Sequence, residues 1–137
     1  MADIAITAAN VVSGANAVTE QGLAGAAITA GQLVYKEAAT GKYKLSDADS
    51  ATAEVRGVRG VALNNAAAGQ PLTVQTKGQI TIGGTLTVAA AYFASATAGA
   101  IAPVADMTTG KYPTFLGFGI TASILDLNIA SSGVAVP

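Results

Sequence analysis

Apolar and polar residues alternate most regularly between residues 60 and 82. Two runs, 72–76 and 79–82, place an apolar residue at nearly every second position. A period of two residues is typical of a strand with one buried face. Lys77-Gly78 lies between the runs and indicates a tight turn, so this stretch predicts a β-hairpin.

Turn residues bound further short strands on the N-terminal side of this stretch. Residues 33–36 and 42–45 predict a second hairpin around the turn Thr40-Gly41. Residues 55–63 predict a strand whose glycines indicate bulges or a close approach of the backbone to a neighbour. Short strands separated by turn residues favour an all-β fold.

The second half of the chain repeats the order of these signals. The matching pairs of segments are 34–41 with 92–99, 60–63 with 117–120, and 72–78 with 127–133. The spacing falls from 58 to 57 to 55 residues, which indicates an imperfect duplication of one β unit; chance similarity between two Ala- and Gly-rich segments is the alternative. Two similar sheets that face each other would bury both apolar faces.

We therefore predict an all-β fold, a jelly-roll-like β-sandwich that a duplicated β unit can build. The 137 residues suit a single domain, spanning residues 1–137, with one sizeable core. Residues 1–25 are small and irregularly patterned, and we interpret them as an N-terminal arm.

The chain carries few charges. Charged residues make up 11% of the sequence, against about 25% in an average soluble domain, and the net charge is −1. A surface so poor in charge suggests that copies of the chain or a partner cover part of it; an ordinary Ala-rich surface is the alternative. The seven basic residues are scattered among eight acidic ones, which disfavours nucleic-acid binding.

Two segments bear on targeting and on membranes. Residues 78–105 are uncharged, but glycines, a proline and many Thr and Ser residues interrupt them, so they predict buried strands rather than a membrane span. The first residues of the chain include Asp3 where a secretory signal has positive charge, so no signal peptide is expected.

The residue types available exclude several kinds of chemistry. The chain has no Cys and no His, so thiolate nucleophiles and imidazole bases or metal ligands are absent. Asp47 and Asp49 form a D-x-D pair, but a calcium loop needs more oxygen ligands than this segment supplies, and a solvated turn is favoured. We predict no catalytic, cofactor-binding or metal-binding residue, and an enzyme is disfavoured.

The order of turns and strands within residues 27–82 resembles a known family. It reads I-T-A-G-Q-L-V-Y, then A-T-G-K-Y-K-L, then R-G-V-A-L-N-N-A-A-A-G-Q-P-L-T-V-Q-T-K-G, and it is similar to the small cement, or head decoration, proteins of tailed-bacteriophage capsids. The resemblance implies a β-sandwich on the outer surface of the virion head that clamps neighbouring subunits of the major capsid protein. It also implies synthesis in the host cytoplasm and association as a dimer or trimer.

We expect the arm and both arginines to contact the capsid, through Ile4, Ile6, Val11, Arg56 and Arg59. The arm residues are apolar in an irregular segment, and the arginines carry the only guanidinium groups of the chain. The alternative for the arm is an edge strand of the same sandwich. For the arginines it is an internal ion pair with Glu54 or Asp126.

A second function is open to a protein of this kind, a binding module such as a phage tail or fibre domain that contacts a surface glycan of the host. Glycan sites usually present aromatic platforms, and the candidates are Tyr35, Tyr43, Tyr92, Phe93, Tyr112, Phe115 and Phe118. Most of them fall in predicted strands, where a core position is expected.

Overall fold

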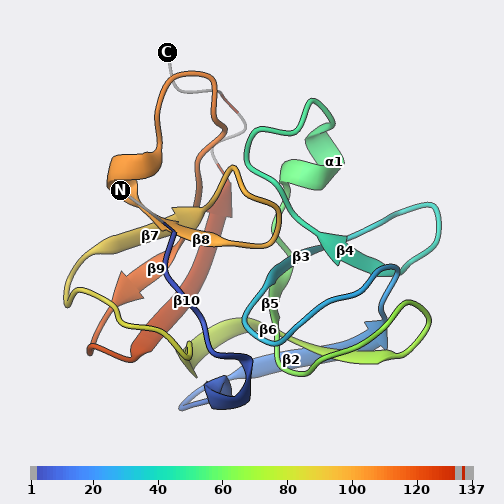
Figure 1. The fold of residues 1–137 in the computed structure, drawn as a ribbon, viewed down its shortest axis with the longest axis horizontal. Helices are drawn as coiled ribbons and strands as arrows, with labels where there is room; N and C mark the ends of the chain where they lie inside the picture. Colours follow the sequence, from blue (N-terminus) through green and yellow to red (C-terminus); the bar gives the residue numbers. More distant parts are fainter. Residues whose placement is uncertain (1–2, 132–133, 135–137) are drawn as a thin grey trace.

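The computed structural model describes residues 3–131 and 134. Within them, ten strands form one sheet that curls over on itself, and the helical segments are single turns (Figure 1). The prediction of an all-β fold is confirmed. The strands are β1 (Val12–Ser13), β2 (Val18–Leu23), β3 (Leu33–Lys36), β4 (Tyr43–Leu45), β5 (Gly60–Ala62), β6 (Pro71–Thr81), β7 (Ala91–Ala94), β8 (Ile101–Pro103), β9 (Thr114–Gly119) and β10 (Ile124–Ser131), and the helical turns are η1 (Ala8–Asn10), α1 (Ala53–Arg56) and η2 (Val104–Asp106).

The longest strand, β6, connects all parts of the sheet. Its first half pairs with β2 and β5, and its second half pairs with β1 and β10. The predicted turn at Lys77-Gly78 is wrong, because β6 continues through these residues. β1 and β2 pair along its whole length and hold it extended. Gly78 has a φ of 91°, and a Cβ there would overlap the carbonyl oxygen of Asn16.

The strand order shows the duplication directly. The order β4-β3-β5-β6 is followed by β10-β9-β7-β8, so the first unit (β3 to β6) and the second unit (β7 to β10) have the same internal pairing. The register agrees as well: Leu33 pairs with Val61 in the first unit, and Ala91 pairs with Phe118 in the second. These positions differ by 58 and 57 residues, the spacings found in the sequence.

The sequence spacing between the last strands of the two units, β6 and β10, differs from the predicted one. The pairing of β10 with β9 places Asp126 where Gln75 lies in the first unit, which is a spacing of 51 rather than 55. The connection between β9 and β10, residues 120–123, is shorter than the connection 63–70 between β5 and β6. The matched Gly133 lies outside the described residues.

The main core lies between the two units. Leu33 and Val61 of the first unit pack in one cluster with Tyr92, Leu116 and Leu125 of the second, and all five side chains are buried. Burying one such apolar side chain contributes about 1.5–3 kcal/mol. The packing of the units against each other therefore makes a large contribution to the stabilising burial.

A second, smaller cluster covers the opposite surface of the first unit. Val34 and Val74 of the sheet pack there with Tyr43 and with Ala24 and Ile28 from the segment that follows β2. This segment is tied to the sheet by backbone hydrogen bonds, including Gly25 N to Tyr43 O at 2.7 Å. The first unit is thus covered on both faces by this chain.

The two glycines at equivalent positions, Gly60 and Gly117, provide a test of the close strand pairing. A Cβ at Gly60 would overlap the carbonyl oxygen of Gln75, and one at Gly117 would overlap that of Asp126. We expect Gly60→Ala and Gly117→Ala each to lower the free energy of unfolding by about 1–3 kcal/mol, because the backbone of the partner strand has to shift. Urea denaturation measures the change.

Gly57→Ala is the matched control. Gly57 has a φ of −80°, and the nearest atom to a Cβ there is 3.5 Å away. Its stability should stay the same or rise by up to about 1 kcal/mol. Equal stability of all three variants would contradict the assigned strand register.

Candidate functional site

The outer face of the second unit, the one turned away from the main core, carries three phenylalanines, of which Phe118 is exposed and Phe93 and Phe115 are half-buried. In this part of the sheet Phe118 lies opposite Ala91 on β7 and opposite Asp126 on β10. Phe93 lies opposite Phe115 in the next row. Directly opposed residues of paired strands project from the same face of a sheet, so these side chains share one surface.

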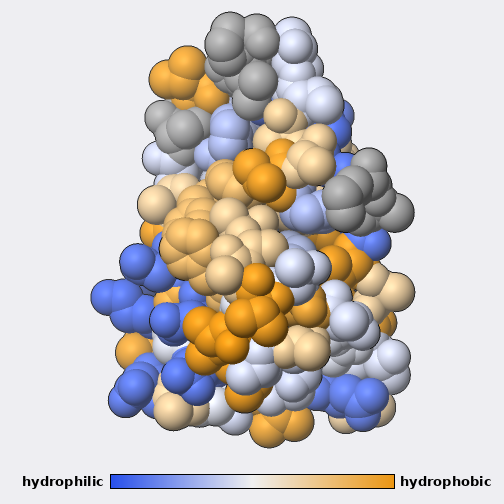
Figure 2. All heavy atoms as spheres, turned by 90° about the vertical axis from the view of Figure 1, so that its left-hand side faces the viewer, coloured by the Kyte–Doolittle hydropathy of each residue, from blue (hydrophilic) through white to orange (hydrophobic). Residues whose placement is uncertain are grey.

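We call the apolar part of this face the phenylalanine surface; it consists of Phe93, Phe115, Phe118, Val88 and Ile120. The rings pack edge to face, with centroids 5.8 Å apart for Phe93 and Phe115 and 5.2 Å apart for Phe115 and Phe118. Phe118, Val88 and Ile120 line a shallow hollow and are 51%, 60% and 40% exposed. Apolar side chains gather on this side of the molecule in Figure 2.

The sequence alone did not predict this surface. The expectation that aromatic residues lie in the core holds for Tyr35, Tyr43 and Tyr92, which are buried. Phe115 and Phe118 are three residues apart, so strict alternation would place them on opposite faces. A register shift in the pairing of β7 with β9 interrupts the alternation, and Leu116 and Gly117 are both buried. Phe115 and Phe118 on either side of them therefore both lie on the outer face.

The arm residues are packed against the protein itself. Val11 is buried in the main core, and the half-buried Ile4 and Ile6 pack against it. The backbone is fixed there too, by hydrogen bonds from Ile4 N to Ile101 O at 3.0 Å and from Thr7 N to Gly83 O at 2.8 Å. A capsid contact at these three side chains stays a prediction, and they already have partners within this chain.

The two arginines are held by different partners and are not brought together. The Arg59 guanidinium donates two hydrogen bonds to the carboxylate of Glu20 on β2, one of them from Nη2 to Oε2 at 3.1 Å. The ion pair therefore joins Arg59 to the arm rather than to Glu54 or Asp126. The guanidinium of Arg56 stacks 3.6 Å from the ring centroid of Tyr112.

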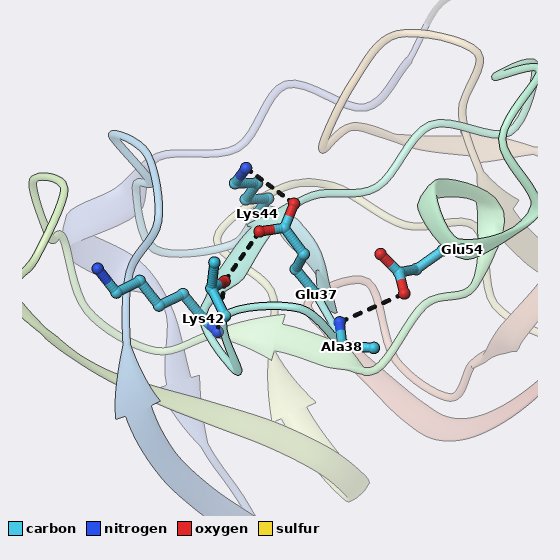
Figure 3. A network of polar contacts seen from close by, with 6 residues as sticks. Glu37, Ala38, Lys42, Lys44 and Glu54 are labelled. Atoms are coloured by element: carbon cyan, nitrogen blue, oxygen red, sulfur yellow. Dashed lines mark hydrogen bonds and ion pairs between the residues drawn. The ribbon is translucent and has the colours of Figure 1, made fainter.

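A polar network closes the hairpin between β3 and β4 (Figure 3). Glu37 accepts hydrogen bonds from Thr40 Oγ1 at 2.8 Å and from Lys44 Nζ at 2.9 Å, and Glu54 accepts one from Ala38 N at 3.3 Å. The Lys44 ammonium lowers the pKa of the Glu37 carboxyl. The carboxylates of this network serve the turn and the packing of α1 beside it.

The D-x-D pair forms a local turn. Asp49 N donates a hydrogen bond to Asp47 Oδ1 at 3.1 Å, and partial burial together with the neighbouring Asp49 raises the pKa of the Asp47 carboxyl. Within residues 3–131 and 134, no group of three or more acidic residues is placed to hold a metal ion. No helix among the same residues is long and apolar enough to cross a membrane.

One edge of the arm strand β2 is open. β2 pairs with β6 along one edge, and no other strand of the described residues pairs with it. Opposite Gln21 lies Thr73, whose N–H donates to Asn64 Oδ1 and whose carbonyl accepts from Leu63 N, both at 2.8 Å. Since Thr73 directs both groups to the β5 side, Gln21 directs its own N–H and C=O away from β6, to the open edge.

Comparisons with models of known protein families and with curated protein sequences find no match for the chain. The function therefore has to be inferred from the surfaces of the molecule. Two surfaces of the described residues could bind a partner: the phenylalanine surface through apolar side chains, and the open edge of β2 through backbone groups.

The ion pair between Arg59 and Glu20 should make stability depend on pH. The Arg59 guanidinium lowers the pKa of Glu20 below its usual value of 4.5. A carboxyl whose pKa is lowered in the folded state stabilises the protein at pH values above its pKa in the unfolded chain. This contribution is lost as the pH falls through the pKa of the folded state. We expect Arg59→Gln to cost about 0.2–1 kcal/mol at pH 7, because both side chains are partly in water.

Urea denaturation of Arg59→Gln at pH 7 and at pH 3 measures this effect. The difference from the natural chain should be smaller at pH 3, which is below the usual pKa of 4.5, because the contribution of a carboxylate with a lowered pKa falls as the pH falls below that value. Lys42→Gln is the control for loss of one positive charge, since Lys42 points away from the hairpin network in Figure 3. If Arg59→Gln lowers the free energy of unfolding equally at both pH values, the effect comes from packing rather than from the ion pair.

Proposed function

We propose that this chain is a structural decoration protein that binds the outer surface of a tailed-bacteriophage head and bridges neighbouring subunits of the major capsid protein. The sequence resemblance that supports the proposal covers residues 27–82, which form β3, β4, β5 and β6. The role is mechanical and non-enzymatic. Packaged DNA pushes the shell outward, and area buried between this protein and two adjacent subunits resists their separation.

The observation that carries the proposal is the open edge of β2. An exposed edge can add to a strand of another protein through backbone hydrogen bonds, which need no particular side chains. Edge strands are normally protected in soluble proteins. The edge strands β4 and β8 are protected here, since Gly25 N bonds to Tyr43 O and Ile4 N bonds to Ile101 O, whereas β2 is left open.

The inward packing of the arm makes this edge a firm attachment point. Val11, just before β1, is buried in the main core, and β2 is held by six paired positions along β6. Force applied to β2 is therefore transmitted through β6 to both units. A free arm would have to be ordered on binding, which costs conformational entropy; this one is already ordered.

Many copies on one shell would compensate for a small contact area. A six-residue strand is about 20 Å long, so strand addition alone buries less than the roughly 1,200–2,000 Å² of a stable interface. Repeated attachment to a lattice raises the overall strength without new contacts. The near-neutral charge of the chain suits an outer location, away from the packaged polyanion.

The phenylalanine surface favours a second candidate, the glycan-binding module. Aromatic rings can stack on sugars, but these three pack edge to face and present no continuous flat platform. Saturable binding to a surface glycan of the host, lost in Phe118→Ser, together with absence of the protein from heads would favour this function over decoration.

Gln21→Pro tests the decoration function at the open edge. Proline removes the N–H that faces the open edge, and the preceding residue is already in the extended conformation that proline requires. We expect the variant to fold and to lose most of its binding to heads. The measurement is co-sedimentation with heads of the phage that encodes the chain, after these have been stripped of this protein.

Gln21→Ala is the control, because it changes the same side chain and keeps the N–H. It should bind at the same fixed ratio to the major capsid protein as the natural chain. Circular dichroism and thermal unfolding establish that both variants are folded. If the folded natural chain does not bind stripped heads, the proposed function is wrong; if Gln21→Pro binds as well as Gln21→Ala, the open edge is not the contact.

A further inference from the structure

A half-open hollow lies beside the start of the arm, and we call it the Asp3 hollow. Its walls come from three parts of the chain: Asp3 and Ile4 of the arm, residues within 85–92 that lead into β7, and residues 103–105 at the end of β8. Its volume is about 340 Å³. This volume lies at the lower end of the roughly 300–1,000 Å³ that is typical of ligand pockets.

Most of the wall of the Asp3 hollow is apolar. Ile4 contributes from the arm and Pro103 from β8, and the small side chains of Ala90 and Ala91 lie between β7 and the loop before it. Val104 also lines the hollow and is 55% exposed, so it stands at the rim. A wall of this kind suits the aliphatic part of a ligand.

A carboxylate is fixed at the hollow by two neighbouring contacts. Asp3 Oδ1 accepts a hydrogen bond from Ser95 Oγ at 2.6 Å. The adjacent backbone is held by the hydrogen bond from Ile4 N to Ile101 O at 3.0 Å. The position of the carboxylate is therefore set before any ligand arrives, so binding costs little conformational entropy on this side.

The other polar groups of the wall are hydroxyls. Tyr92 Oη accepts a hydrogen bond from Thr87 N at 2.8 Å, which fixes the phenol, and Thr85 and Thr87 also line the hollow. A hydroxyl oxygen has two lone pairs and can accept hydrogen bonds from a donor. Together with the carboxylate, these oxygens suit a ligand group that carries several N–H donors.

The charge of the hollow is negative. Among the described residues that line it, Asp3 is the charged one, and no ion pair joins Asp3 to another described residue. Lys111 is the only basic residue after Lys77 in the sequence. It lines an adjoining hollow, where its Nζ donates a hydrogen bond to the carbonyl oxygen of Asp106 at 2.9 Å.

We propose that the Asp3 hollow binds the side chain of a lysine or arginine that a protein partner presents. The aliphatic stem lies along the apolar wall, as the stems of Lys and Arg do on apolar surfaces. The charged end reaches the Asp3 carboxylate and forms a charge-assisted hydrogen bond. A purely apolar ligand would cover the carboxylate without giving it a partner, which costs free energy.

The shape of the hollow favours a protein side chain over a free small molecule. Pockets for small ligands enclose most of the ligand surface, whereas this hollow is open on one side, with the exposed Val104 at its rim. A side chain can enter it while its own main chain stays outside. In the proposed function the partner is a capsid subunit, but the chemistry of the site can be tested without heads.

An NMR titration of the full chain with small probes tests the proposal. Butylammonium represents the lysine side chain, 1-butanol is the neutral control of equal length, and butyrate is the anionic one. Butylammonium should bind with a dissociation constant on the order of millimolar and shift the amide signals of Ile4, Tyr92 and Val104. Butanol should bind several-fold more weakly, and butyrate should not bind.

A blocked lysine, N-acetyl-lysine N-methylamide, separates the two possible sources of the amine. Its peptide groups occupy the place of a protein main chain, so it should bind as well as butylammonium does. If butylammonium binds and the blocked lysine does not, the hollow takes a free amine, and the proposal of a protein partner is wrong.

Asp3→Asn tests the role of the carboxylate. Asparagine keeps an oxygen that can accept the hydrogen bond from Ser95 and removes the charge. We expect the affinity for butylammonium and for blocked lysine to fall at least fivefold, and the affinity for butanol to stay the same. Asp126→Asn is the matched control, because it removes one negative charge at an exposed position of β10; it should bind both amines as the natural chain does.

Two further results would overturn the proposal. One is equal affinity for butanol and butylammonium, and the other is an Asp3→Asn variant that is folded by thermal unfolding and binds the amines as well as the natural chain does. These measurements contain no heads, so their failure leaves the co-sedimentation result unaffected. If blocked lysine binds but the natural chain does not bind stripped heads, the decoration function is wrong and the hollow serves another protein.

Discussion

The rest of the structure depends on β6 being paired along both edges. β6 is the last strand of the first unit, yet its second half pairs with β10 of the second unit, so one strand joins the two units into a single sheet. Neither unit could bury its apolar face alone, since Leu33 and Val61 need Tyr92 and Leu116 as packing partners. The arm completes this arrangement, because β1 and β2 occupy the remaining edge of β6 along both halves. Pairing on both sides explains why a Lys-Gly step that would form a turn in an isolated hairpin stays extended here.

Much of the fold was predictable because its signals are local. The alternation around residues 72–82, the hairpin at Thr40-Gly41 and the repeat near 58 residues all depend on short stretches of chain. The burial pattern of β6 follows the alternation except at Val74 and Gln75, which are both buried, and the strand pairing reproduces the hairpin and the repeat. The predictions that failed depend on partners distant in sequence. Lys77-Gly78 looks like a turn until β1 and β2 are placed beside it. The spacing of the last strand came from matching Leu127 to Leu72, whereas the actual register follows from the length of the loop before β10.

The candidate contacts were less predictable for the same reason. An apolar residue in an irregular segment can be a binding residue or a core residue, and only the position of the main core shows that Val11 is buried by its own chain. The pairing of Arg59 with Glu20 joins residues 39 positions apart, which no local pattern indicates. The phenylalanine surface was missed because alternation assumes a regular strand, and one register shift in β9 reverses the direction of Phe115 relative to Phe118.

The duplication explains why a chain of two similar halves offers two different kinds of surface. If the halves packed symmetrically, both would expose equivalent faces and both would need equivalent covering. Instead, the face of the first unit that carries Val61 packs on the opposite face of the second, and this arrangement leaves one unmatched face at each end of the pair.

The chain covers the unmatched face of the first unit with the segment after β2. The strand β2 itself stays at the margin of the sheet with an open edge. The unmatched face of the second unit has no such cover. The exposed edge and the exposed face are therefore two consequences of one asymmetric packing: the edge belongs to the arm strand beside the first unit, and the face belongs to the second unit.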